Sequence, residues 1–279
     1  MWKSPAAAAV AALTLAAPAW CASVDVDGAV PGHAGVTWRR LLQAVAPDLK
    51  DDGDQTVGHV PEPLRHLAGA DEGGALPDPQ VFTELEATTV KVGGRAYIAL
   101  IADLGPSDDR VASNTLLALF DGSPTPRLVD AAAVGLDRLT GFNDPDRIRI
   151  GPADEALITY SEHFNSSQTY SGRLIAFAHD GKLQLIEQLS DLAVRACGYE
   201  IYETPTFATH PDKGRRFWRI EITQHEVLKA DPTEDCDKRP PRAYRHTYRE
   251  VLRWDDGKGR YVVVSSDFGK LDKRDRARF

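Results

Sequence analysis

The chain has 279 residues, of which 42% are hydrophobic and 27% are charged, so it is long enough to bury a sizeable core and disorder throughout is excluded. The formal net charge is -8 at pH 7, which argues against a nucleic-acid partner. Beyond the N-terminus no apolar stretch reaches the roughly 20 residues that a membrane-spanning helix needs, so we expect no transmembrane span in the mature chain.

Residues 1–22 have the layout of a secretory signal peptide. Lys3 supplies the positive start, a small and apolar run follows from Ala6 to Ala17, and Pro18 ends that run just before small residues. Lipid attachment at Cys21 is disfavoured because the three preceding residues lack the aliphatic residue typical of such sites. We therefore predict a protein that is periplasmic or extracellular after signal removal.

Residues 23–86 form a helical and loop segment in this reading. Apolar residues recur at helical spacing between residues 37 and 46, with Thr37 as the N-cap and Pro47 at the stop. A second, short helix through Leu64 and Leu67 is a further expectation. The stretch from Gly69 to Pro79 is rich in Gly, Pro and Asp and is interpreted as a linker.

Residues 87–279 are predicted to be mainly β, built from three repeated four-stranded antiparallel meanders. Each unit ends in a hairpin whose turn carries Asp-Gly, a pair that accepts the positive φ of tight hairpins. The expected strands are 89–92, 95–104, 114–120 and 127–131 in the first unit, 147–150, 156–164, 173–179 and 183–189 in the second, and 199–209, 217–228, 244–254 and 260–265 in the third.

Three meanders are too few for a closed propeller of four to eight blades. The units could form an open, propeller-like or sandwich-like domain, the N-terminal segment could cover an exposed strand edge, or two chains could complete a ring. We favour the first two together, because an uncovered strand edge invites aggregation.

Cysteine use agrees with export. Cys197 and Cys236 are the two cysteines outside the signal segment, and an oxidising compartment favours their pairing. In the repeat model both fall on the same edge of the sheet, because Cys197 precedes the first strand of the third unit and Cys236 follows the second. We predict a disulfide between them.

The connections between the second and third strands of each unit are the long ones, so function is expected on that edge. They span residues 105–113, 161–171 and 229–243. The resulting acidic, partly aromatic rim gives these candidate binding residues: Asp108, Asp109, Glu162, His163, Tyr170, Asp231, Glu234 and Asp235.

Glu162 and His163 are the best candidates for acid-base chemistry, because histidine titrates near neutral pH and a carboxylate can orient it. A solvated loop with one incidental histidine is the simpler interpretation. The sequence has no nucleophile elbow, no zinc motif and no glycine-rich phosphate loop, so we expect no catalytic residues, metal or cofactor.

The charge is unevenly distributed along the chain. Residues 239–279 carry 12 basic and 6 acidic side chains, so an acidic body precedes a basic tail. Because acidic residues interrupt this basic run, we interpret it as a solvated terminus rather than as a site for polyanions.

Three functions from different classes remain open. The favoured one is an exported, non-catalytic binding or inhibitor-like protein that recognises a basic protein or an envelope component through the acidic edge. The alternative is a periplasmic hydrolase that uses Glu162 and His163 with neighbouring carboxylates. The third is a structural envelope protein.

Overall fold

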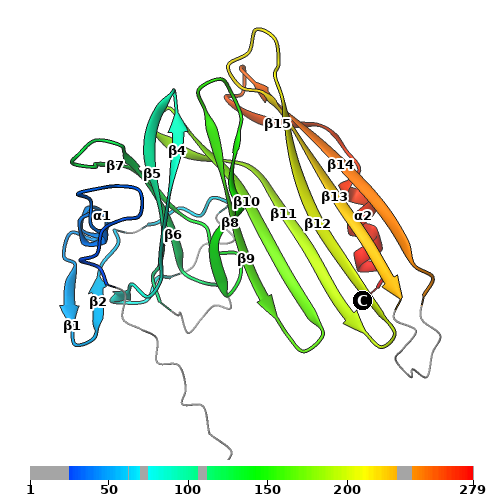
Figure 1. Ribbon diagram of the computed structural model, residues 1–279, viewed down its shortest axis with the longest axis horizontal. Coiled ribbons are helices and arrows are strands. Elements are labelled where there is room, and N and C mark those ends of the chain that lie inside the picture. The colour runs from blue at the N-terminus through cyan, green and yellow to red at the C-terminus, as the bar shows by residue number, and fades with distance from the viewer. Residues whose placement is uncertain (1–24, 62, 70–74, 106–111, 231–240, 279) are drawn as a thin grey trace, which may run out of the picture.

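A computed structural model describes residues 25–61, 63–69, 75–105, 112–230 and 241–278. Over these residues the protein is mainly β, with fifteen strands in three antiparallel sheets and two helices, which confirms the mainly β class expected from the sequence (Figure 1). Within the same ranges, neither helix has the length and hydropathy required to cross a membrane. The signal segment predicted for residues 1–22 lies outside the described residues.

The N-terminal segment forms one helix and a small sheet. Helix α1 spans Trp38–Val45, and the side chain of Thr37 accepts a hydrogen bond from the backbone N–H of Arg40, so the predicted helix and its N-cap are confirmed. The sheet, which the sequence analysis did not predict, has the order β1-β2-β3 and consists of Lys50–Asp52, Gln55–Gly58 and Gln80–Val81.

The second helix expected near residues 64–67 is wrong. This stretch instead forms a single parallel bridge to the end of strand β7 (Leu128–Ala133), where the N–H of Leu67 donates to the carbonyl of Ala133 at 3.0 Å and the N–H of Ala133 donates to the carbonyl of Arg65 at 2.8 Å. Because β7 is the last strand of its sheet, these bonds cover the Ala133 end of an otherwise unpaired edge. The N-terminal segment thus covers this part of a strand edge without a helix.

The first predicted meander is present as a separate four-stranded sheet of order β4-β5-β6-β7. Its strands are Leu85–Val92, Arg95–Asp103, Thr115–Asp121 and Leu128–Ala133.

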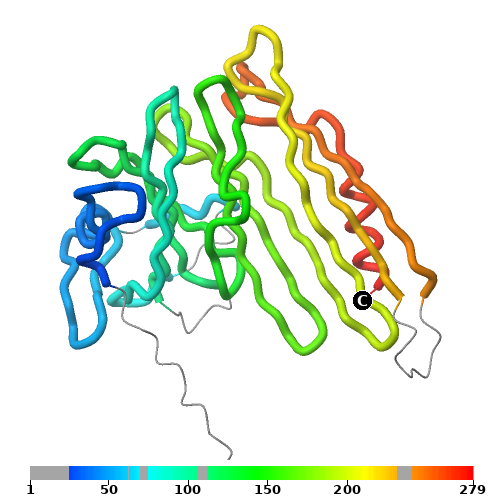
Figure 2. The backbone as a smooth tube through the Cα atoms, in the orientation of Figure 1, coloured from blue at the N-terminus to red at the C-terminus, as the bar shows by residue number. Residues whose placement is uncertain are grey.

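The second and third predicted units are not separate, because β11 pairs with β12 and joins them into one eight-stranded antiparallel sheet that runs from β8 to β15. That junction is short, with four paired positions between residues 193–196 and 199–202. Figures 1 and 2 show the eight strands following one another as a continuous meander. The strands are Leu139–Arg149, Glu155–Phe164, Gln168–His179, Lys182–Ala196, Tyr199–His210, Arg219–Ala230, Tyr244–Asp255 and Arg260–Ser266.

Three apolar cores explain the packing. The first lies between α1 and one face of the four-stranded sheet, where Leu41 and Leu42 share a cluster with Leu100 and Phe120. The second lies between the other face of that sheet and β9–β11, and includes Leu117 and Leu174. The third joins β9–β11 to β13–β15 and is built around Phe177, Phe217 and Trp254. Strand alternation, which sends neighbouring side chains to opposite faces, lets β10 contribute to two cores at once.

The hairpins predicted from the Asp-Gly pairs are present. Glycine is required in their turns for different physical reasons. Asp180 and Gly181 both have positive φ, at 50° and 73°, as a tight hairpin turn requires. At Gly122 the reason is space, because an added Cβ would lie 2.1 Å from the carbonyl oxygen of Ala96.

The basic C-terminus is not a solvated tail along its whole length. Residues Phe268–Arg276 form helix α2, whose Leu271 is buried. Figure 1 shows α2 lying along β13 and β14, with the C-terminus near the lower ends of these strands. Periodicity of apolar residues missed this helix because it buries so few of them.

Candidate recognition site at the strand-end edge

The strand ends that flank the connections predicted to carry function lie at a common edge, which we call the strand-end edge. It is the edge at which β5, β9, β11 and β13 end, at the bottom of Figure 1 for the eight-stranded sheet. The pairing of Tyr199 with Ala230 shows that β12 begins where β13 ends. The candidate residues Asp108, Asp109, Asp231, Glu234 and Asp235 all lie outside the described residues, between strands that meet this edge.

The predicted disulfide also maps to this edge. Cys197 follows β11 in its tight connection to β12 and is exposed. Cys236 lies outside the described residues, between β13 and β14. The pairing of Tyr199 with Ala230 places the start of β12 beside the end of β13, and the disulfide stays a prediction.

The prediction of a long loop over residues 161–171 is wrong. β9 and β10 stay paired as far as Phe164 and Thr169, so only a tight turn over residues 165–167 separates them. Glu162, His163 and Tyr170 therefore lie on strands, not on a loop. Asn165 shapes this turn, because its side-chain oxygen accepts from the N–H groups of Ser167 and Gln168.

Glu162 does not orient His163, because adjacent residues of a strand point to opposite faces. The carboxylate that does so is Asp137, from the connection between β7 and β8. Its Oδ2 lies 2.5 Å from Nδ1 of His163. Sequence reasoning missed Asp137 because it is 26 residues away from His163 along the chain, and only the pairing of β8 with β9 brings the two together.

Tyr170, directly opposite His163 in the register, stacks on its ring with a centroid separation of 5.2 Å. His163 and Tyr170, both predicted as residues of the rim, therefore do lie together. Next to this pair, the buried hydroxyl of Ser161 hydrogen-bonds to Thr140 and accepts from the N–H of Leu136, so it is already engaged. The arrangement offers an oriented imidazole, whereas the nearby serine has no hydrogen bond to that ring among the contacts of the described residues.

Glu162 belongs to a second group on the other face of β9. It is paired opposite Leu139 and is two residues from Phe164, so these three side chains share a face. Leu139 is 45% exposed and Phe164 is 67% exposed, which is unusual for large apolar side chains.

Carboxylates gather beside these apolar side chains. Tyr160, also on this face, has its pKa raised by burial and by the negative charges of Glu162, Glu86 and Glu84. Glu84 and Glu86 flank the start of β4, which pairs with the end of β5 and so reaches the same edge. We call Leu139, Phe164, Glu162, Glu84 and Glu86 the edge patch. It combines exposed apolar surface with negative charge, a combination suited to a partner with basic and apolar groups.

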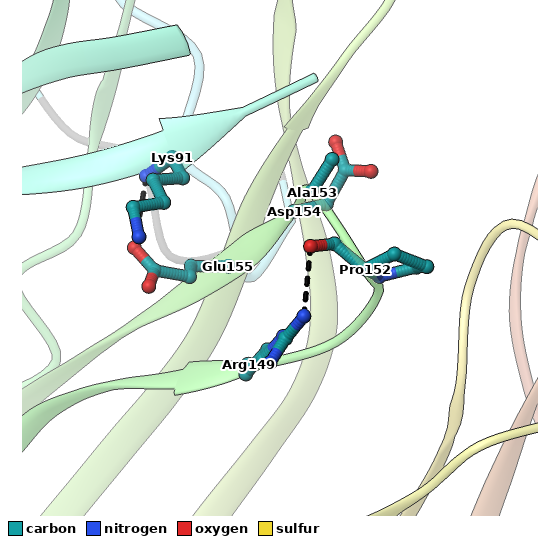
Figure 3. Close-up of a pocket in the computed structure, with 6 residues that line it drawn as sticks. All are labelled: Lys91, Arg149, Pro152, Ala153, Asp154 and Glu155. Atoms are coloured by element: carbon teal, nitrogen blue, oxygen red, sulfur yellow. Dashed lines mark hydrogen bonds between the residues drawn. The ribbon is translucent and has the colours of Figure 1, made fainter. Parts of the chain in front are cut away.

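A small pocket lies at the opposite end of the sheets. It encloses about 280 Å³ between β4 and the β8–β9 turn and is lined by Lys91, Arg149 and residues 152–155 (Figure 3). Arg149 donates to the carbonyls of Gly151 and Pro152 at 2.9 Å each, so this guanidinium braces the turn. We therefore assign the pocket a structural role.

Within the described ranges, no group of three or more His, Cys, Asp or Glu side chains has an arrangement able to hold a metal ion. No protein-family model matches the chain, and neither the characterised proteins nor the solved structures that were compared with it give a match.

Proposed function

We propose that this is an exported, non-catalytic binding protein that recognises a basic protein or a cationic envelope component through the strand-end edge. The observation that carries the proposal is the edge patch, where exposed Phe164 and Leu139 lie beside Glu162. The acidic residues of the neighbouring connections, Asp108, Asp109, Asp231, Glu234 and Asp235, extend this charge in the sequence. Export through a signal peptide over residues 1–22 is part of the same proposal.

The test is affinity capture from the cell envelope, followed by association and dissociation rates of the purified partner. Charge reversal at Asp231 and Glu234 to Lys should slow association, because rim charges act mainly through the encounter. Raising the salt concentration from 0.1 M to 1 M should have a similar effect, since the Debye length falls from about 10 Å to about 3 Å. Phe164→Ala should speed dissociation.

Asp52→Lys with Asp54→Lys is the matched control, because it changes the charge equally on an exposed hairpin of the N-terminal sheet. A captured partner whose rates are indifferent to salt, to the edge reversals and to Phe164→Ala would refute the proposal.

A hydrolase is the second candidate, and the Asp137–His163 pair is the observation that favours it. The carboxylate that the hydrolase hypothesis assigned to Glu162 is replaced by Asp137. Hydrolysis of model ester or peptide substrates that is lost in His163→Asn and retained in Glu162→Gln would support this candidate over the binding protein.

A further inference from the structure

Helix α2 is held mainly by charge rather than by apolar contact. Leu271 is its one buried residue within the described range, and Phe268 packs against the third core. The remaining contacts come from Arg274, Asp275 and Arg278, which face acidic and aromatic side chains of β12–β14. Such a helix depends on its ion pairs to stay docked.

Its docking surface consists of Glu203, Glu226, Tyr244 and Tyr248, which we call the α2 patch. Glu203 pairs with Glu226 between β12 and β13, and the tyrosines come from β14. Glu226 is fully buried and accepts from the hydroxyls of Tyr244 at 2.6 Å and Tyr248 at 2.9 Å.

Two arginines of the C-terminus complete the surroundings of Glu226. Arg274 lies 3.2 Å from it and covers the ring of Tyr244 at 4.8 Å, and Arg278 forms ion pairs with both Glu226 and Glu203. The patch therefore holds guanidinium groups both by ion pairs and through an aromatic face.

Asp275 is the acidic side chain that α2 brings to the patch. It accepts from Arg278 at 2.6 Å, and its carboxyl group also hydrogen-bonds to that of Glu203. Burial, together with the charge of Asp275, raises the pKa of Glu203 to about 7, although Arg278 acts in the opposite direction. A helix with a neutral side chain in place of Asp275 would place no second carboxyl group against Glu203, at the loss of the ion pair between Asp275 and Arg278.

Unused acceptors lie beside the patch. Gln224, which pairs opposite Tyr248, is 2% exposed, and its side-chain oxygen has no hydrogen-bond partner among the described residues. Glu250, two residues from Tyr248 on β14, is 6% exposed, and one of its carboxylate oxygens also has no hydrogen-bond partner among the described residues. Buried acceptors without donors are costly, so these two oxygens are positions at which a bound segment with other donors would gain hydrogen bonds.

We propose that the α2 patch is a recognition site for a basic helical segment of a partner protein, and that α2 is its autoinhibitory occupant. The partner segment carries two arginines four residues apart, as Arg274 in the last turn of α2 and Arg278 in the turn just after it are placed. It lacks the acidic residue that α2 places against Glu203. This site is separate from the edge patch and does not depend on it.

The probe is a synthetic peptide with the sequence of residues 267–279 carrying Asp275→Asn, titrated by calorimetry into the full chain. The double variant Arg274→Ala with Arg278→Ala should release α2 and bind the peptide about tenfold or more tightly than the unaltered chain, because the resident helix no longer competes. Adding Glu226→Gln to the double variant should abolish that binding.

The matched control is Arg276→Ala. Arg276 pairs with Asp272 on the exposed side of the same helix, so this variant should bind the peptide as the unaltered chain does. Hydrogen exchange of the α2 amides provides the second readout, and should rise in the double variant and, at saturating peptide, in the unaltered chain.

Two results would overturn the proposal. One is a double variant whose α2 amides stay protected, and the other is a double variant that releases α2 without gaining affinity for the peptide. Asp275→Asn in the full chain tests the proposal without releasing α2, so it remains informative if the double variant fails to fold. This variant should protect the α2 amides further and weaken binding of the added peptide. No change in either property would contradict the proposal. Phe164→Ala should leave peptide binding unaltered, which separates this result from that of the edge patch.

Discussion

Single residues at the strand-end edge owe their roles to contacts between segments far apart in the sequence. His163 was identified from its chemistry, yet the group that orients it is Asp137 and not its neighbour Glu162. A run of residues cannot reveal that a strand continues to Phe164, because polar side chains are typical both of loops and of strand ends. The pairing of β9 with β10 continues to Phe164, so Glu162 and His163 both lie in a strand and their side chains point to opposite faces.

Glu226 offers the sharpest test at this scale. Replacing it with Gln leaves the guanidinium group of Arg274 without its buried counter-charge and removes one of the carboxylates that Arg278 contacts, so Glu226→Gln should lower the free energy of unfolding by about 3 kcal/mol or more. Urea unfolding measures this value. Glu221→Gln is the control, because Glu221 is on the opposite face of the same strand and pairs with exposed Arg249, and should cost less than about 1 kcal/mol. Equal losses would contradict this account of the α2 patch.

At the scale of elements, α1 shows how a short helix is fixed by packing. An isolated helix of this length is not stable in water, so its stability comes from the first core, where Leu41 and Leu42 are fully buried. The two leucines, together with Val45, form one face that packs against the four-stranded sheet. The same apolar spacing that predicts the helix therefore also identifies its buried side.

Leu42→Ala should lower the free energy of unfolding by about 2–5 kcal/mol, because it removes buried apolar surface and leaves a cavity. Denaturant unfolding followed by tryptophan fluorescence gives the value. Gln43→Ala changes an exposed neighbour on the same helix and should be almost neutral. A comparable loss in both variants would mean that the helix contributes through its backbone rather than through this core.

For the molecule as a whole, three titratable groups with raised pKa values should make the free energy of unfolding depend on pH. Burial, with the adjacent charge of Glu250, raises the pKa of Glu187 to about 7, and burial with Asp275 does the same for Glu203. The pKa of His59 is raised by hydrogen bonds to Asp48 and Asp78. All three bind protons more tightly in the folded state than in the unfolded state.

Their stabilising effect is complete below the unfolded pKa values and is lost as the pH rises through the folded ones. The free energy of unfolding should therefore fall between pH 5 and pH 7.5, as urea unfolding at several pH values would show. Carboxyl groups whose pKa is lowered, such as Asp121 and Glu221, lose their stabilising contribution only at more acidic pH. They therefore do not change the free energy of unfolding in this pH range. Glu203→Gln should flatten the decline, and an unchanged slope would contradict the assignment.

The sequence by itself determined much of the local structure of this protein: the N-capped helix near residues 37–46, the central part of most strands and the Asp-Gly hairpin turns. These follow from alternation, helical spacing and turn chemistry, which act between neighbours in the chain. Only the tertiary structure decided that β11 pairs with β12, that residues 65–67 cover β7, and that α2 docks on Glu203 and Glu226. The reason is physical, because these features depend on contacts between distant segments, and a buried carboxylate is identical in sequence to a solvated one until a partner such as Arg278 reaches it.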